Sequence, residues 1–259
     1  MTVGDRLEIV GLTDVGRMRE HNEDKIGWEK ELGLILLADG MGGHNAGEVA
    51  SDLTVTRIKE EIKNAIADSD SSGQSEINDA QAVVLSMNAI NSANQYVYQT
   101  ANDQPLCAGM GTTLVLTLFG KDSVTIAHIG DSRIYRLRQD NLEQLTTDHS
   151  LVEEMVRRGY FSKQEALHAV NKNMITRALG VAPEVDIEIQ QKEIQSGDIY
   201  LLCSDGLTDI VSDSDIHATL RDSSNDFDQC AKRLIEMANN NGGHDNISVV
   251  LVRIKEADK

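Results

Sequence analysis

The sequence lacks the features that would place this protein in a membrane or in an oxidising compartment. No apolar run approaches the ~20 residues that a membrane-spanning helix needs, and the first residues lack the apolar core of a signal peptide. There are only three cysteines, Cys107, Cys203 and Cys230, and none forms a Cys-x-x-Cys pair. We expect these thiols to be reduced and mostly buried. These absences favour a soluble, cytoplasmic protein without a membrane partner.

Positive charge is also scarce. The 259 residues carry 24 Lys and Arg against 42 Asp and Glu, a formal net charge of -18. Binding to a nucleic-acid backbone requires clustered Lys and Arg that displace counterions, so we expect no nucleic-acid partner. An acidic surplus usually means a solvated surface, and it also fits a protein that gathers cations.

Glycine patterns typical of nucleotide binding are missing as well. The segments 40–43 and 109–111 contain closely spaced glycines, but each lacks the third glycine at the required spacing. No Gly-Lys-Ser or Gly-Lys-Thr follows a suitable loop. The sequence therefore gives no support to a mononucleotide-binding fold.

The residue pattern predicts short strands and a few long helices. The β-rich runs are residues 7–12, 34–38, 113–119, 124–129, 133–137, 199–203 and 247–254, and apolar residues at three- and four-residue spacing mark helices at 48–66, 79–101 and about 226–240. Two adjacent long helices followed by closely spaced strands predict an α+β fold with two sheets and helices packed outside them. Only two prolines and one short Ser/Asp-rich stretch interrupt the chain, so we predict a single domain over 1–259 with an excursion at about 146–177.

Several predicted strands run directly into an acidic residue. Asp39, Asp131 and Asp205 follow apolar strands, and Asp245 immediately precedes another. A single Asp-Gly after a strand is more often a turn than a metal ligand. Several such carboxylates converging on rigid strand ends would repel one another unless a cation neutralised them. Without a matching Cys or His cluster, they favour Mg²⁺ or Mn²⁺ over zinc.

A charged segment near the amino terminus adds a phosphate-binding candidate. Arg19 lies close in sequence to Glu20, Glu23 and Asp24, and a guanidinium suits bidentate binding of phosphate oxygens. Taken alone, the segment also reads as an ordinary charged surface turn. It gains weight only in combination with the acids at the strand ends.

Six blocks of the sequence match one known family in order. They are TD-x-G-x-x-R-x-x-NED at 13–24, ADGMGGH at 38–44, GTT at 111–113, GDSR at 130–133, CSDGL at 203–207 and DN at 245–246. Together they span nearly the whole chain. The sequence resembles the bacterial branch of the metal-dependent serine/threonine protein phosphatases of the phosphatase 2C type. This resemblance implies a β-sandwich of two antiparallel sheets flanked by antiparallel helix pairs, with a dinuclear Mn²⁺ or Mg²⁺ site at one end.

The resemblance also implies roles for individual residues, carried over by motif position. Asp39 would bridge both metals, and the carbonyl of Gly40 would bind the second metal. Asp205 and Asp245 would complete the first, and Glu23 would bind the second. Asp24 would hold metal-bound water, Asp131 would share a weaker third metal with Asp205, and Arg19 would bind the phosphoryl group.

The implied chemistry is hydrolysis of phosphoserine and phosphothreonine in proteins, in which the two cations activate a water that attacks phosphorus in line. The proton donor to the leaving oxygen stays open. Eukaryotic relatives carry histidine directly after the Asp-Gly, whereas this chain has Met41. His44 and a water held by the metals are the alternatives, and water is the preferred one.

The remaining expectations concern partners and alternatives. The resemblance implies a bacterial Ser/Thr kinase and its substrates as partners, and we expect a monomer. Two other functions stay open: a catalytically weak relative that regulates a partner by docking, and a hydrolase of small phosphate esters. The excursion at 146–177 corresponds to the flap of the family, in which Arg157, Arg158, Tyr160 and Phe161 would either touch substrate or simply pack.

Overall fold

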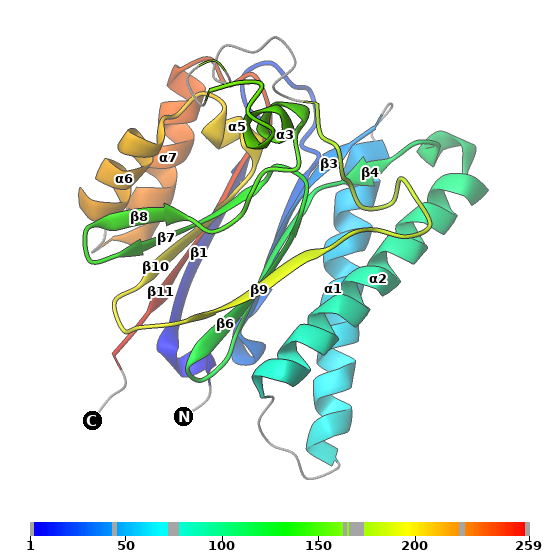
Figure 1. Cartoon of the computed structure of the whole chain (residues 1–259), viewed down its shortest axis with the longest axis horizontal. Coiled ribbons are helices and arrows are strands. Elements are labelled where there is room, and N and C mark those ends of the chain that lie inside the picture. Colours follow the sequence, from blue (N-terminus) through cyan, green and yellow to red (C-terminus); the bar gives the residue numbers. More distant parts are fainter. Residues whose placement is uncertain are drawn as a thin grey trace.

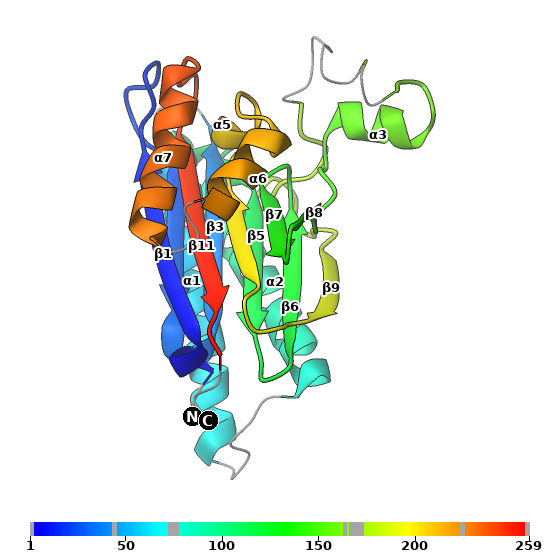
Figure 2. The same ribbon diagram turned by 90° about the vertical axis from the view of Figure 1, so that its left-hand side faces the viewer.

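Two antiparallel sheets pack face to face, and helices cover their outer faces (Figure 1). The computed structural model describes residues 3–42, 46–71, 78–162, 165, 174–222 and 226–256. The view turned by 90° looks onto the face of one sheet, with helices in front of its strands (Figure 2). The α+β fold with two antiparallel sheets predicted from the sequence is therefore confirmed.

The first sheet has the strand order β1-β11-β10-β7-β8. Its strands are β1 (Leu7–Asp14), β7 (Arg133–Arg138), β8 (Asn141–Gln144), β10 (Ile199–Cys203) and β11 (Ile247–Ile254). Helices α6 (Asp213–Asp222) and α7 (Phe227–Asn240) pack on its outer face, and the short helix α5 (Asp205–Thr208) follows β10 directly. This sheet therefore brings the amino-terminal and carboxy-terminal strands together as neighbours.

The second sheet has the order β2-β3-β5-β6-β9, and β4 pairs with β3 beside it. Its strands are β2 (Asp24–Glu29), β3 (Leu34–Met41), β4 (Gly111–Thr112), β5 (Leu114–Phe119), β6 (Ser123–Ile129) and β9 (Glu188–Glu193). The long helices α1 (Ala46–Ser71) and α2 (Asp79–Asp103) cover its outer face. Helix α3 (Leu151–Arg157) lies in the flap region, and 3₁₀ turns occupy Gly4–Arg6, Lys30–Leu32 and Pro105–Cys107.

Successive side chains point to opposite faces of each strand. This alternation divides the core into three layers and sets the direction of the acids at the strand ends. In β3, Leu34 and Leu36 pack against the helix pair, whereas Ile35 and Leu37 face the other sheet. Successive side chains of a strand point to opposite faces, so Asp39 continues on the face of Ile35 and Leu37. The strand therefore delivers this carboxylate between the two sheets, where the sandwich ends.

The strands and long helices predicted from the sequence all exist, with boundaries that differ by a few residues. The Ser/Asp-rich stretch after residue 66 had been expected to be a loop, but α1 continues to Ser71. Four strands and two helices were missed: β2, β4, β8, β9, α5 and α6. β8 and β9 carry many charged and polar residues because they lie at sheet edges, and such strands lack the apolar run that marks a central strand.

Two smaller expectations were also tested. All three cysteines are free and buried, as predicted. No helix in the described ranges is long and apolar enough to cross a membrane. The prediction of a single domain across the chain stays a prediction.

Candidate active site

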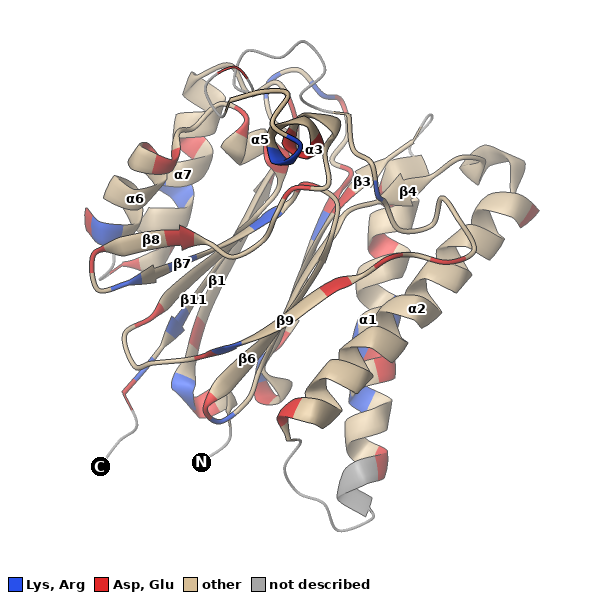
Figure 3. Ribbon diagram, viewed as in Figure 1, with Lys and Arg blue, Asp and Glu red and all other residues tan. Residues whose placement is uncertain are grey.

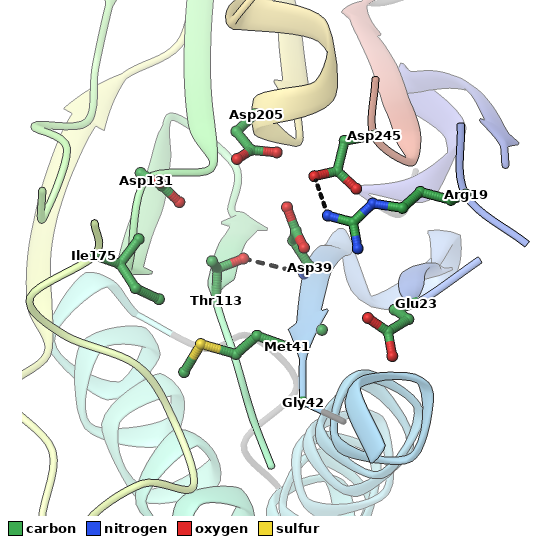
Figure 4. A pocket seen from close by; sticks show the side chains of 11 residues that line it. Arg19, Glu23, Asp39, Met41, Gly42, Thr113, Asp131, Ile175, Asp205 and Asp245 are labelled. Atoms are coloured by element: carbon green, nitrogen blue, oxygen red, sulfur yellow. Dashed lines mark hydrogen bonds and ion pairs between the residues drawn. The ribbon is translucent and has the colours of Figure 1, made fainter. Parts of the chain in front are cut away.

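A pocket at the upper end of the sandwich in Figure 1 collects acids from both sheets. Its lining contains most of the residues that the sequence singled out: Arg19, Glu23, Asp39, Gly40, Asp131, Asp205 and Asp245, together with Met41, Gly42, Thr113 and Ile175. Figure 4 shows the carboxylates of Asp39, Asp205 and Asp245 pointing toward one another. Other acids are spread along the helices and strand edges (Figure 3), so the charge of the chain is not confined to the pocket. The pocket differs from these other acidic regions because its carboxylates point toward one another.

Burial raises the pKa of the central carboxyl groups, and their mutual repulsion raises it further. The pKa of Asp39 lies well above its ordinary value because the group is desolvated and faces Asp24, Asp205 and Asp131. Desolvation, followed by the charges of Asp131, Asp209 and Asp245, raises the pKa of Asp205 in the same way. For Asp131, burial and the charge of Asp148 raise the pKa to about 7. Carboxylates arranged so that they destabilise one another are a site that a cation would stabilise.

Asp24 lies behind Asp39 rather than in the pocket wall. It is the residue opposite Asp39 in the β2–β3 register, and it is 7% exposed. The hydroxyl of Ser204 donates to its Oδ2 at 2.8 Å, whereas the buried Oδ1 has no hydrogen-bond partner in the described part of the chain. Desolvation raises the pKa of Asp24 to about 6. A buried carboxylate oxygen without a hydrogen-bond partner, on the residue paired with Asp39, fits a position beside a cation or its water.

Two glycines, each next to one of these acids, allow another backbone segment to pack closely against the chain. A Cβ on Gly40 would stand 2.1 Å from the carbonyl oxygen of Gly47, and one on Gly206 would stand 2.0 Å from that of Asn246. Neither space can hold a side chain, because these neighbours are backbone atoms. Asp39 and Asp205 therefore each precede a residue that must be glycine for the chain to pack here. The acid set, the backbone approach and the orphaned Asp24 oxygen together fit hard divalent cations with oxygen ligands.

Arg19 is placed at the pocket, where it contacts one of the acids. Its Nη2 lies 2.7 Å from Oδ2 of Asp245, and the two side chains are 50% and 32% exposed. Figure 4 shows Arg19 and Glu23 on the side of the pocket away from Ile175. The half-exposed guanidinium is therefore within reach of an anion entering from solvent.

Asn246 holds the loop that carries Arg19 and Glu23. Its side-chain Nδ2 donates to the carbonyls of Val15 and His21, at 3.0 and 2.9 Å, and its Oδ1 accepts from the N–H of Glu23 at 2.8 Å. These three bonds join the loop before β2 to the start of β11. The sequence identified Asn246 only as part of a motif, because nothing in its local pattern shows that it pairs with residues more than two hundred positions away.

A partly buried ion pair lies next to the turn that carries Asp131. Arg133 makes three hydrogen bonds of 2.7 to 3.0 Å with the carboxylate of Asp148 and a fourth with the hydroxyl of Tyr135. Charge-assisted bonds in a forked geometry fix orientation as well as adding energy. The pair ties β7 to the loop that leads into the flap. Asp131 lies two residues before Arg133, next to this anchored point of the chain.

The histidines near the flap form hydrogen bonds rather than a catalytic group. The ring of His128 is 1% exposed and its Nε2 lies 2.8 Å from the carbonyl oxygen of Thr147, which can only accept, so this nitrogen carries a proton. Nδ1 of His149 accepts from the N–H of Gly130 at 3.2 Å, and its Nε2 faces Glu188 at 3.3 Å. His128 is therefore a hydrogen-bonded core residue, as predicted from the sequence.

These two rings and Glu188 bring three metal-ligating side chains close together, with ligand atoms within 4.8 Å of one another. The rings are stacked, with centroids 4.6 Å apart and planes 23° from parallel. Ring lone pairs lie in the ring plane, so stacked rings do not direct theirs at one shared ion. The hydrogen bonds to Gly130 and Thr147 also occupy one nitrogen of each ring. The cluster therefore serves to join the start of the flap to β6.

The segment Asp148, His149 and Ser150, which superficially suggests a catalytic triad, does not act as one. Asp148 pairs with Arg133, and Ser150 caps helix α3 by accepting from the N–H of Glu153 at 3.2 Å. His149 contacts neither side chain. His44, one of the alternative proton donors, lies outside the described residues.

Comparisons with known proteins agree with this fold and pocket. The family model of protein phosphatase 2C matches residues 17–251. The serine/threonine phosphatase stp of Listeria welshimeri is 38% identical over 244 residues, which is 93% of each chain. The protein phosphatase PhpP of Streptococcus pneumoniae is 38% identical over 255 residues, which is 97% of this chain and 99% of PhpP.

Solved structures give the same result. The Mycobacterium tuberculosis serine/threonine phosphatase PstP/Ppp superposes with a TM-score of 0.86 at 35% identity, covering 96% of this chain and 99% of that one. The catalytic domain of PstP in complex with two manganese ions gives a TM-score of 0.83, again at 35% identity and covering 96% and 99% of the two chains. The chain belongs to the protein phosphatase 2C family and is a metal-dependent protein serine/threonine phosphatase.

Proposed function

We propose that the pocket holds two divalent cations, Mn²⁺ or Mg²⁺, and uses them to hydrolyse phosphoserine and phosphothreonine in proteins. The observation that carries the proposal is the convergence of buried carboxylates whose pKa values are raised by burial and mutual repulsion. Asp39 would be shared by both ions, and Asp205 and Asp245 would hold the first. Glu23 and the carbonyl of Gly40 would hold the second.

A weaker third ion is assigned to Asp131 and Asp205. Asp131 lines the pocket from the connection between β6 of the second sheet and β7 of the first, whereas Asp205 follows β10 of the first. The charge of Asp131 raises the pKa of Asp205, which supports a short separation between the two carboxyl groups. A cation between them would relieve this repulsion without involving Asp245.

When bound, the cations supply a water nucleophile at neutral pH and offset the charge that develops on the phosphoryl oxygens. The side chains of the protein orient the phosphoryl group and the water. The Arg19 guanidinium binds two phosphoryl oxygens and holds phosphorus in line. Asp24, fixed by Ser204 and set behind Asp39, accepts a hydrogen bond from water at the centre. We propose a water at the metal site as the proton donor to the leaving oxygen, with His44 as the alternative, since Met41 follows Gly40 and offers no proton.

The natural substrates in this proposal are proteins phosphorylated by a Ser/Thr kinase, whose action the enzyme reverses in the cytoplasm. The curated relatives are named as serine/threonine or protein phosphatases, which supports protein substrates. We further propose that the chain acts as a monomer with one catalytic domain over 1–259. Its flap, at about 146–177, stands beside the pocket through Ile175.

The test combines turnover with metal counting. Purified protein should hydrolyse a phosphothreonine peptide with Mn²⁺ and lose this activity on chelation, and calorimetry should count two tight Mn²⁺ ions per chain. Asp131→Ala should remove only weak additional binding, whereas Asp122→Asn, a change at an exposed turn, should alter neither count. Failure to bind Mn²⁺ would favour a docking regulator, and a clear preference in kcat/KM for a phosphorylated metabolite would favour a small-ester hydrolase.

A further inference from the structure

One wall of the acidic pocket is apolar, and it continues outward over the surface. Met41 and Ile175 line the pocket on the side away from Arg19 and Glu23, and the Met41 side chain extends toward Ile175 (Figure 4). Neither side chain can bind a cation of the Mg²⁺ class, and neither donates a proton. These two apolar side chains beside the carboxylates therefore serve a role other than the hydrolytic step.

Val181 extends this wall away from the metals. A Cβ on Gly111 would stand 2.7 Å from Cε of Met41 and 2.8 Å from Cγ1 of Val181, so these two side chains meet over the bare backbone of Gly111. Gly111 is the partner of Met41 in the β3–β4 register. Met41 and Ile175 therefore line one side of the pocket, and Val181 lies beside Met41 over Gly111; we call these three side chains the apolar strip. Val181 is 49% exposed at its outer end.

The apolar strip is built on backbone that is fixed on both sides. Leu179 and Thr112 exchange two backbone hydrogen bonds of 2.8 and 3.0 Å, which holds the chain two residues before Val181. The buried side chain of Asn94 accepts from the N–H of Gly180 and donates to the carbonyl of Ala182, at 2.8 and 3.1 Å. Val181 stands between these two anchored residues. Its exposure is therefore a set feature of the fold and not that of a loose loop tip.

Ile175 is anchored in the same manner from the other side. It forms a bridge with Ser150, and the next residue, Thr176, donates its N–H to the carbonyl of His149 at 2.7 Å. The strip therefore joins the returning end of the flap to the metal pocket. A substrate whose phosphoryl group sits among the acids must lay its neighbouring residues across one side of the pocket, and this side is apolar.

We infer that the apolar strip binds an apolar side chain of the phosphoprotein within two positions of the phosphorylated residue, and so selects phosphosites with apolar flanks. The inference rests on the proposed function, because it places the phosphoryl group in the acidic pocket. A substrate with an acidic residue beside the phosphosite would bind less well for two reasons. The apolar strip would desolvate the carboxylate, and Asp131 and Asp39 would lie close enough to repel it. A leucine-like side chain covers exposed apolar surface instead.

The test uses phosphothreonine peptides that differ at one position, with Leu, Ser or Asp placed in turn at each of the two positions on either side. We expect one position at which Leu raises kcat/KM at least about fivefold over Ser, since partial burial of a leucine side chain contributes roughly 1 kcal/mol. The peptide with Asp at that position should have a lower kcat/KM than the peptide with Ser. Each value is divided by the kcat/KM for p-nitrophenyl phosphate, which has no flanking residues.

Matched variants assign the preference to the apolar strip. Val181→Ser should reduce the Leu-to-Ser ratio to below about twofold, and Met41→Ser should do the same where it folds. Val84→Ser, the same change at a 56% exposed valine of α2, should leave the ratio as in the wild type. A wild-type enzyme that hydrolyses all peptides equally, or a leucine preference that survives Val181→Ser, would overturn the inference and leave the proposed function intact. Loss of all activity toward both peptides and p-nitrophenyl phosphate in the presence of Mn²⁺ would overturn both.

Discussion

The raised pKa of Asp131 predicts that the metal-free protein becomes less stable as the pH rises. In the folded chain this carboxyl titrates near 7, because it is buried and faces Asp148, whereas in the unfolded chain it titrates near the ordinary ~3.9. Between these values the folded state holds more protons than the unfolded state. The free energy of unfolding therefore falls with pH across this window, since stability rises with pH only where the unfolded state binds more protons.

The magnitude follows from the pKa difference. Each pH unit inside the window removes about 1.4 kcal/mol, so raising the pH from about 5 to about 8 removes roughly 3 kcal/mol through Asp131. Asp131→Asn replaces the carboxyl by a neutral group of the same shape and abolishes this term. It also relieves the repulsion on Asp39 and Asp205, which acts in the same direction. The variant should therefore gain stability over the wild type as the pH rises.

Thermal unfolding in the presence of a chelator measures this difference. For a chain of this size 1 kcal/mol corresponds to about 2–4 °C in Tm, so the gap between Asp131→Asn and the wild type should widen by roughly 6–12 °C between the two pH values. Burial lowers the pKa of His128 and His149, which makes stability rise with pH below about 6.5. Both proteins share this opposing effect, and it cancels in the comparison.

The exposed change Asp122→Asn serves as the control and should keep a constant gap from the wild type. With saturating Mn²⁺ the wild type should recover, and the gain in Tm from Mn²⁺ should be larger at the higher pH, because binding requires deprotonated carboxylates. A gap between Asp131→Asn and the wild type that stays constant or narrows as the pH rises would refute the reasoning.

Four further variants test the remaining geometry. Asp39→Asn should lower kcat at least about 10²-fold with Mn²⁺, since a bridging carboxylate cannot be replaced by an amide, and steady-state kinetics with wild-type values would disprove the bridge. Arg19→Ala should raise KM for a phosphopeptide roughly tenfold through loss of a charged hydrogen bond, and an unchanged KM would count against phosphate contact. Gly206→Ala should weaken Mn²⁺ binding at least about tenfold in a calorimetric titration, because its Cβ has no room beside a backbone carbonyl 2.0 Å away; wild-type affinity would contradict this. His149→Ala leaves the N–H of Gly130 without its acceptor and should cost about 1–3 kcal/mol in urea unfolding, with partial recovery in His149→Asn.

The strongly apolar elements were predictable from sequence because their signal is local. Strand β3 is buried throughout most of its length, and α2 carries apolar residues at helical spacing. The edge strands β8 and β9 escaped prediction because a strand paired on one side only tolerates charged residues, such as Glu143 and Lys192, that erase the alternating pattern. Helix α6 escaped for a related reason, since most of its residues are polar and only Ile216, Thr219 and Leu220 are buried.

The sequence by itself predicted which residues would carry the chemistry, because acids at strand ends and the ordered motif blocks are properties of the chain. It determined neither how deep each acid lies nor which groups face it. Only the tertiary structure placed Asp24 behind Asp39 with one oxygen unpaired, paired Arg19 with Asp245, and tied the flap base to β6 through His149. These relations join residues far apart in the chain, and they depend on how the two sheets face each other. The same is true of the apolar strip, in which Met41 and Val181 meet because Gly111 has no side chain to separate them.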